Sequence, residues 1–284
     1  MYRFFLSSPA ILCLLASSVS ANNIVVLPQE NSNSTTATIY TALPFAQAGS
    51  FTVDPLAFQA HWHPNGQKLY IISKSVQRSI AIHSGTAPFL ETGFRSLPNI
   101  IAARLTPDGR RLYALSQAVR VYDTSNDQEV TGINIGSTPV DIDFALDSSR
   151  AFVLGANGTL TAIDVATNRV VSTLNITGSP NSVFVGPTGL IYVTASNRIL
   201  EIDGRDALTQ VGNDIAITGS NCLKTQFTPD GSRLVSACAA GGTTNIFVVD
   251  VISRTVTNTA IGGSVAERFK VISNATALLY ILSL

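Results

Sequence analysis

The sequence contains few charged residues. Asp, Glu, Lys and Arg make up 13% of its 284 residues, about half the share of about 25% that is usual in soluble proteins. The 18 basic and 18 acidic residues balance, and no run of like charge occurs. A surface for nucleic acid usually needs a basic stripe, so we predict no nucleic-acid partner. Long disordered segments are not expected either, because 45% of the residues are hydrophobic.

Recognisable catalytic motifs are missing as well. The chain has no Gly-x-Ser-x-Gly nucleophile elbow, phosphate-binding loop, dinucleotide fingerprint or zinc-protease motif. Ser, His and Asp are all present, but no spacing between them nominates a catalytic triad. No catalytic residue and no cofactor are predicted. The sequence points away from an enzyme without deciding the question.

The first 21 residues have the features of a cleavable signal peptide. Arg3 supplies the positive start, residues 10–16 (AILCLLA) form an apolar core, and residues 19–21 (VSA) suit cleavage. The apolar core is shorter than the about 20 residues that span a bilayer, and no later segment is long enough to be a transmembrane segment. We predict a signal peptide over 1–21 and a single domain over 22–284, in a secreted protein (extracellular, periplasmic or cell-surface).

One pattern recurs about every 42 residues after the signal peptide. Its copies share a short apolar stretch, a turn related to Pro-Asp-Gly, and a second apolar stretch. They cover residues 60–70, 103–113, 142–152, 183–192 and 225–235, with a degenerate sixth copy over 271–280. A repeat of this length is typical of one four-stranded propeller blade.

Each copy is consistent with four antiparallel strands. In the turn between the first two strands, Pro presets φ and Gly accepts a positive φ. A third strand ends in an Asp that we expect to cap the following turn through Asx hydrogen bonds. These residues are Asp123, Asp164, Asp203 and Asp250. A fourth, more polar strand leads to the next copy, and the predicted fold is an all-β propeller of four-stranded antiparallel blades.

Two copies carry the motif most fully. Residues 106–113 (TPDGRRLY) are followed by residues 121–123 (VYD), and residues 228–231 read TPDG. This pattern resembles the YVTN-type β-propeller repeat, in which a Pro-Asp-Gly turn, a Leu-Tyr-Val strand and a Val-x-Asp strand recur. The resemblance covers nearly all of residues 22–284 and implies a secreted propeller of lactonase-like or surface-layer type. It implies little about activity, because many unrelated activities share this scaffold.

The two ends of the chain suggest how the ring closes. The last copy supplies two strands, about 265–272 and 277–282, and two strands at the N-terminus are left over. Residues 23–27 resemble a third strand and residues 36–41 a fourth. We predict that this N-terminal pair completes the last blade, which gives six blades and a closed ring without exposed edges. Seven blades or a truncated chain are the alternatives.

Two cysteines remain after the signal peptide, Cys222 and Cys238. They lie symmetrically about Asp230, so in a regular hairpin Gln226 faces Leu234 and the two cysteines face each other. Directly opposed Cβ atoms are about 4.5–5.5 Å apart, within reach of a disulfide after slight adjustment. Export to an oxidising compartment favours the bond. We therefore predict a disulfide, with two buried thiols as the alternative.

Polar residues recur at equivalent positions of the first strands, which in a propeller surround the central channel. Phe184 occupies one such position as an apolar exception. The candidates for ligand binding there are His61, Arg104, Asp141, Asp143, Lys224 and Gln226. The alternative is that these residues line a water-filled channel and pair with one another.

The histidines give little support for a metal site. His61 and His63 lie on one face of a strand, but two histidines without further ligands are weak evidence. His63 stands at a turn where other copies have Thr106, Ala145, Gly186 and Thr228. His83 takes the place of the strand-ending Asp. We predict a structural role for both, and no metal.

We predict a secreted or cell-surface binding module. Its partner would be an unknown protein, glycan or small-molecule ligand at the loop-rich face or channel mouth. A lactonase-like hydrolase with a channel metal is the alternative that the resemblance implies, with Asp141, Asp143 and Glu267 as the nearby acids. A truncated propeller domain of a larger extracellular protein is a third possibility.

The predicted cleavage site defines the mature protein. We expect a secreting host to release a protein that begins at Asn22, with the intact mass of residues 22–284. A membrane-bound product that retains Met1 would indicate an uncleaved anchor instead.

Overall fold

The computed structural model describes residues 10–11, 23–28, 35–42, 45–217, 222–228, 230–240 and 243–261. All regular elements in these ranges are β-strands, which confirms the predicted all-β class. A search of the same ranges finds no helix that could cross a membrane. The chain divides into two compact units, unit 1 (Met1–Asn99) and unit 2 (Ile100–Leu284).

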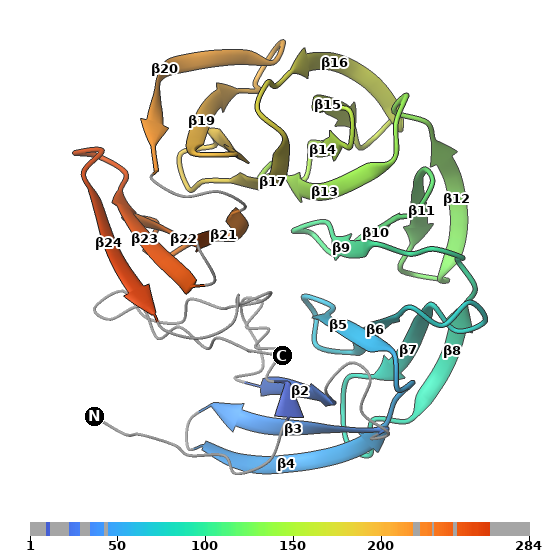
Figure 1. Ribbon diagram of the computed structural model, residues 1–284. Helices are drawn as coiled ribbons and strands as arrows, with labels where there is room; N and C mark the ends of the chain where they lie inside the picture. Colours follow the sequence, from blue (N-terminus) through green and yellow to red (C-terminus); the bar gives the residue numbers. More distant parts are fainter. Residues whose placement is uncertain are drawn as a thin grey trace. The chain divides into compact units, whose positions relative to one another are not determined.

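Unit 2 contains four consecutive four-stranded antiparallel sheets (Figure 1). Within each sheet the strands pair in chain order, so that each sheet is a meander. The strands are β9 (Ala102–Leu105), β10 (Arg111–Leu115), β11 (Val119–Asp123), β12 (Gln128–Ile133), β13 (Pro139–Phe144), β14 (Arg150–Gly155), β15 (Thr159–Asp164), β16 (Arg169–Asn175), β17 (Pro180–Val185), β18 (Ile191–Ala195), β19 (Arg198–Asp203), β20 (Thr209–Ala216), β21 (Cys222–Phe227), β22 (Arg233–Ala240), β23 (Thr243–Asp250) and β24 (Val256–Ile261).

Unit 1 contains two further sheets. The strands are β1 (Ala10–Ile11), β2 (Asn23–Pro28), β3 (Thr36–Ala42), β4 (Phe45–Thr52), β5 (Ala57–Trp62), β6 (Lys68–Ser73), β7 (Ile80–Ser84) and β8 (Glu91–Arg95). Strands β5–β8 form a complete four-stranded sheet, and β1–β4 form the other in the order β1-β2-β3-β4. The two-residue strand β1 lies within the predicted signal peptide.

Successive sheets of unit 2 pack as the blades of a β-propeller. The first strands β9, β13, β17 and β21 contact one another in succession. The second strand of one blade also contacts the first strand of the next, as β14 does with β17. This packing of four-stranded antiparallel sheets confirms the predicted propeller fold.

Burial on both faces explains the long apolar runs in the sequence. One core cluster combines Tyr113 and Val121 of one blade with Phe144 and Val153 of the next, all at most 2% exposed. The Tyr113 and Phe144 rings meet edge to face, with centroids 5.1 Å apart. Every residue of β18 is buried. A middle strand covered on both faces can tolerate few polar residues, so the period-two alternation of a half-exposed strand is lost.

The N-terminal strands differ from the prediction. Residues 36–42 form the interior strand β3, and β4, which the sequence analysis did not identify, pairs with its far edge. The register shift between β3 and β4 recurs between the third and fourth strands of four other blades, as between β7 and β8. Strand β2 contacts β5 as other second strands contact the next first strand. The segments at 23–28 and 36–42 are therefore a second and a third strand, whereas a third and a fourth were predicted.

The predicted closing strands, 265–272 and 277–282, lie outside the described residues. The pairing of residues 23–27 with 277–282 therefore stays a prediction.

The repeated turns form as expected. The carboxylate of Asp108 accepts the Thr106 hydroxyl at 2.6 Å and the Arg110 N–H at 3.0 Å, and Gly109 has a φ of 75°. In the copy that contains His63, its Nδ1 lies 2.6 Å from the Asn65 side-chain oxygen. His63 thus replaces the Thr of the turn, which supports its predicted structural role.

The Asp residues that end the third strands cap the turns after them. The carboxylates of Asp123, Asp164, Asp203 and Asp250 accept backbone N–H groups two or three residues later, at 2.8–2.9 Å. Hydroxyl donors, then backbone N–H donors, lower the pKa of Asp123 and Asp164. The predicted Asx capping is confirmed.

A disulfide joins Cys222 and Cys238, as predicted, but through a different register. Gln226 lies opposite Val235 rather than Leu234, because the hairpin is centred half a residue further on than expected. A β-bulge between Cys222 and Lys224 absorbs the difference and brings the cysteines opposite each other. The same bulge occurs near the start of β5, β13 and β17, so the blade architecture sets the pairing.

We expect the Cys222→Ala/Cys238→Ala double variant to lose about 3 kcal/mol of unfolding free energy, since the bridge closes a loop of about 15 residues. Urea denaturation of variant and parent measures the change. Two titratable thiols in the unfolded, unreduced parent would show that the bond does not form.

Candidate functional site

The predicted polar residues of the first strands form a structural network in unit 2. Arg104 Nη1 on β9 lies 2.5 Å from Asp143 Oδ1 on β13. The other oxygen of Asp143 accepts the Val185 N–H of β17 at 2.8 Å. Asp141 accepts the N–H of Val183 at 3.0 Å. The network therefore connects three consecutive blades.

The edge position of β17 explains why these carboxylates are there. Strand β17 pairs only with β18, so alternate N–H groups point away from their own sheet. A buried N–H without an acceptor costs about 1–3 kcal/mol. Asp141, 8% exposed, supplies one acceptor and also accepts the Ser182 hydroxyl at 3.1 Å. The carboxylates thus satisfy an edge strand of the neighbouring blade.

The carboxylates of Asp143 and Asp141 favour the charged form of the Arg104 guanidinium. Burial by itself would lower the pKa of its guanidinium, but the negative charges of Asp143 and then Asp141 raise that pKa above its ordinary value. The Arg104 side chain retains 35% of its exposure. Arg104 therefore remains positively charged and partly open to solvent.

The other predicted site residues are placed as follows. Gln226 is partly buried on β21, opposite Val235, and the side chain of Lys224 lies outside the described residues. His61 belongs to unit 1, partly exposed on β5 opposite Tyr70. The structure thus joins Arg104, Asp141 and Asp143 in one network. Ligand binding by the six predicted residues stays a prediction.

The equivalent position in the next blade holds Phe184, which is 6% exposed. Its ring stacks on Tyr192 and meets Phe227 of the following blade, each at 5.7 Å between centroids. This face of the first strand therefore contacts the neighbouring blade.

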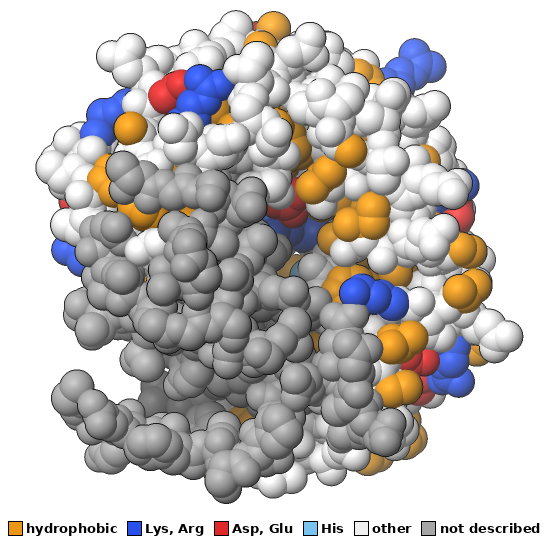
Figure 2. Space-filling model, viewed as in Figure 1, with side chains coloured by type: hydrophobic (Ala, Val, Ile, Leu, Met, Phe, Trp, Pro, Cys, Tyr) orange, Lys and Arg blue, Asp and Glu red, His pale blue; other side chains and the backbone are white. Residues whose placement is uncertain are grey.

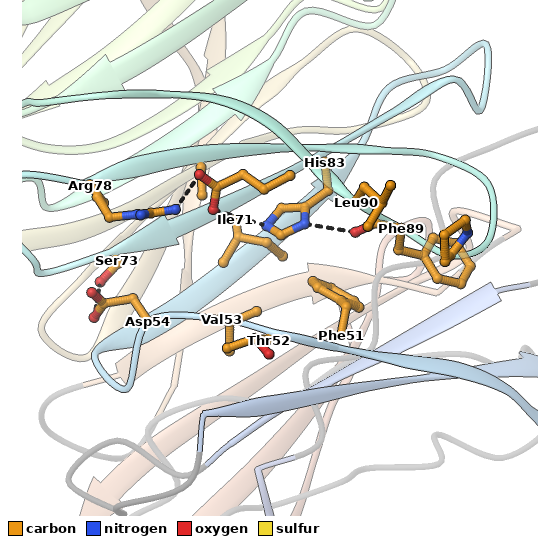
Figure 3. A pocket seen from close by; sticks show the side chains of 13 residues that line it. Phe51, Thr52, Val53, Asp54, Ile71, Ser73, Arg78, His83, Phe89 and Leu90 are labelled. Atoms are coloured by element: carbon orange, nitrogen blue, oxygen red, sulfur yellow. Dashed lines mark hydrogen bonds and ion pairs between the residues drawn. The ribbon is translucent and has the colours of Figure 1, made fainter.

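Unit 1 contains a pocket that the sequence analysis did not identify. Its volume is about 570 Å³, and it lies between β4 and the sheet of β6–β8 (Figure 3). We call it the His83 pocket. It is lined by Phe51, Thr52, Val53, Asp54, Ile71, Ser73, Arg78, Ala81, His83, Pro88, Phe89, Leu90 and Glu91.

The pocket holds a buried histidine with one unpaired nitrogen. His83 is 2% exposed, and its Nδ1 lies 2.9 Å from the Phe89 carbonyl oxygen. Because a carbonyl only accepts, Nδ1 carries the proton, and in the neutral ring Nε2 is an acceptor. Among the described residues Nε2 has no hydrogen-bond partner, and Glu91 Oε2 lies 4.0 Å from it. Desolvation lowers the pKa of His83 from 6.5, so it is neutral at pH 7.

Charged groups line the same pocket. The Arg78 guanidinium pairs with Glu91 Oε1, and Arg78 also lies over the Phe94 ring at 5.1 Å. On the β4 side, Asp54 Oδ1 accepts the Ser73 hydroxyl at 2.8 Å and the Leu56 N–H at 2.9 Å. The pocket therefore combines charged and uncharged polar groups with the Phe51 and Phe89 rings.

One departure from the repeat marks this pocket in the sequence. His83 stands where other blades have an Asp, and it caps its own loop through Phe89, six residues later. This contact supports the structural role predicted for it. The imidazole is longer than an Asp side chain, and its second nitrogen, Nε2, is buried. No sequence feature had indicated the side of the pocket formed by β4, because β4 itself was not predicted.

On the face shown in Figure 2, charged side chains of both signs are scattered among hydrophobic and other groups of the described residues. Among the described residues, no group of three or more His, Cys, Asp or Glu side chains could hold a metal ion. Glu267, named for the hydrolase alternative, lies outside them.

The comparisons with known proteins support the fold alone. No protein-family model matches the chain, and no curated protein does. Hydrazine synthase of Kuenenia stuttgartiensis matches with a TM-score of 0.55 and 20% identity, over 63% of this chain and 53% of that chain, so this chain spans about half its length. A chain in the crystal structure of the mitotic checkpoint complex matches with a TM-score of 0.66 and 16% identity, over 76% of this chain and 68% of that chain. Both are propeller-type folds of four-stranded antiparallel sheets, and neither identifies the YVTN-type family.

We expect Asp141→Ala to lower the unfolding free energy by about 1–3 kcal/mol, because it leaves the buried Val183 N–H without an acceptor. Denaturation of Asp206→Ala provides the control, since Asp206 is exposed and its backbone oxygen, retained in the variant, accepts Arg150. Equal stability of the two variants would contradict the structural role of Asp141.

Proposed function

We propose that this protein is a secreted or cell-surface binding module whose propeller holds the His83 pocket as its ligand site. The observation that carries the proposal is the Nε2 atom of His83, a buried acceptor without a partner among the described residues. Buried polar atoms are normally hydrogen-bonded, and an exception inside a pocket is a reason to look for a ligand.

The fold supports an interaction role. The mitotic checkpoint complex, in which one structural neighbour occurs, is a multiprotein assembly, and hydrazine synthase shows that the same fold also occurs in an enzyme. In this chain, Asp141 and Asp143 accept backbone N–H groups of the next blade. Nothing among the described residues specifically favours a channel-metal hydrolase.

Export rests on the sequence and is compatible with the disulfide. Residues 1–21 have the features of a signal peptide. The Cys222–Cys238 bond suits an oxidising compartment. An exported protein would then meet ligands outside the cell.

Ligand binding can be tested on purified residues 22–284 with a diverse fragment library and ligand-observed NMR. We expect hits whose binding is lost in Leu90→Trp, because Leu90 is 64% exposed and lines the pocket, so a larger side chain obstructs it.

The matched control is Val130→Trp, which places the same side chain at an exposed position of β12 in unit 2. Hits that bind Leu90→Trp as well as the parent, or a library without hits, would refute the pocket as the ligand site.

A further inference from the structure

We propose that the His83 pocket binds a small molecule carrying a protonated primary amine on an apolar body. This inference rests on the proposed function, because it names the ligand class of the same pocket.

Three acceptor atoms of the pocket could receive hydrogen bonds from a ligand. Glu91 uses Oε1 for Arg78, and its Oε2 faces His83 Nε2. Asp54 receives both of its donors on Oδ1, which leaves Oδ2. The third is Nε2 of His83. A ligand that satisfies these atoms must donate hydrogen bonds, and an ammonium group has three N–H donors and no acceptor.

The gap between His83 and Glu91 suits one donor atom. Nε2 and Oε2 are 4.0 Å apart, which is too long for a hydrogen bond between them. A nitrogen placed about 2.9 Å from each can donate to both after a small rotation of the partly exposed Glu91 carboxylate. A hydroxyl group has one O–H and can donate to only one of them.

The charge balance favours a cation. Asp54 and Glu91 contribute two negative charges, Arg78 contributes one positive charge, and His83 is neutral. The pocket therefore has one negative charge in excess. Arg78 pairs with Glu91 and lies over the Phe94 ring, so its positive charge is already engaged.

Aromatic rings supply the apolar part of the site. Phe51 lies 4.7 Å from the His83 ring and 6.0 Å from the Phe89 ring, measured between centroids. All three side chains line the pocket (Figure 3). An amine on a hydrocarbon body can donate to the acceptors while its body packs on these rings, and an ammonium near an aromatic face gains a cation–π attraction.

The test compares three probes of nearly the same size: phenethylamine, 2-phenylethanol and phenylacetate. Titration calorimetry of residues 22–284 measures each affinity at pH 7.5. We expect phenethylamine to bind at least 10-fold more tightly than 2-phenylethanol, and phenylacetate to bind more weakly than either.

Charge-removing variants locate the binding. Glu91→Gln and Asp54→Asn, shown to be folded by their thermal melts, should each weaken phenethylamine binding at least 10-fold. Glu129→Gln is the matched control. It removes the carboxylate of another Arg–Glu pair, Arg120–Glu129, on the surface of unit 2, and should leave the affinity unchanged.

The pH dependence of phenethylamine affinity provides an independent test. The charged groups that act on His83 are Glu91 on β8 and Arg78 before β7, and Asp54 after β4 lines the same pocket. Burial lowers the pKa of His83 from 6.5, so its protonation sets in below that pH. Once protonated, His83 Nε2 becomes a donor and the ring adds a positive charge, so phenethylamine should bind progressively more weakly as the pH falls below 6.5. Binding of 2-phenylethanol should change less.

The outcomes separate this inference from the proposed function. If library fragments bind in the pocket but the amine binds no better than the alcohol, the ligand class is wrong and the binding module stands. If neither library nor probes bind, both proposals fail. Unchanged amine affinity in both carboxylate variants would also overturn the inference, because the amine would then bind elsewhere.

Discussion

The first strand of each blade pairs on only one side, and its open edge constrains the surrounding structure. Its outward N–H groups need acceptors, and only the neighbouring blade can supply them within the core. Asp141 and Asp143 do so for β17. At the next junction the hydroxyls of Thr194, Thr225 and Ser236 form a chain, with 2.9 Å between consecutive oxygens. Polar residues deep between blades therefore determine how the blades meet, while the apolar cores supply the bulk of the burial.

This constraint changes how the polar first-strand residues are interpreted. An acidic residue near the start of a blade suggests chemistry, yet here it satisfies backbone groups of the next sheet. Residues that depart from the repeat are then more informative than residues that follow it. His83 replaces an Asp, reaches the Phe89 carbonyl with one nitrogen and keeps the other inside a pocket. Burial that keeps this ring neutral also keeps it an acceptor, on which the proposed ligand chemistry depends.

Local features were predictable where the interacting groups are close in the chain. The Thr-Pro-Asp-Gly turns and the Asx caps need only residues within about five positions, so their motifs carry the geometry. Strand β4 was missed because its sequence, FAQAGSFT, lacks both the apolar run of a middle strand and a nearby Pro-Asp-Gly turn. Its outer position explains this composition, since the described side chains of β4 are largely exposed. Without β4, one wall of the His83 pocket could not be anticipated.

The sequence by itself determined the repeat, the strand class, the turns and the two cysteines that pair, because these depend on spacing and short-range hydrogen bonding. Tertiary structure alone decided the bulge that aligns Cys222 with Cys238, the backbone N–H donors that Asp141 and Asp143 accept from, and the pocket around His83. Those features join groups from different strands or from neighbouring blades. Their geometry depends on how sheets pack against each other, which a spacing of about 42 residues does not encode.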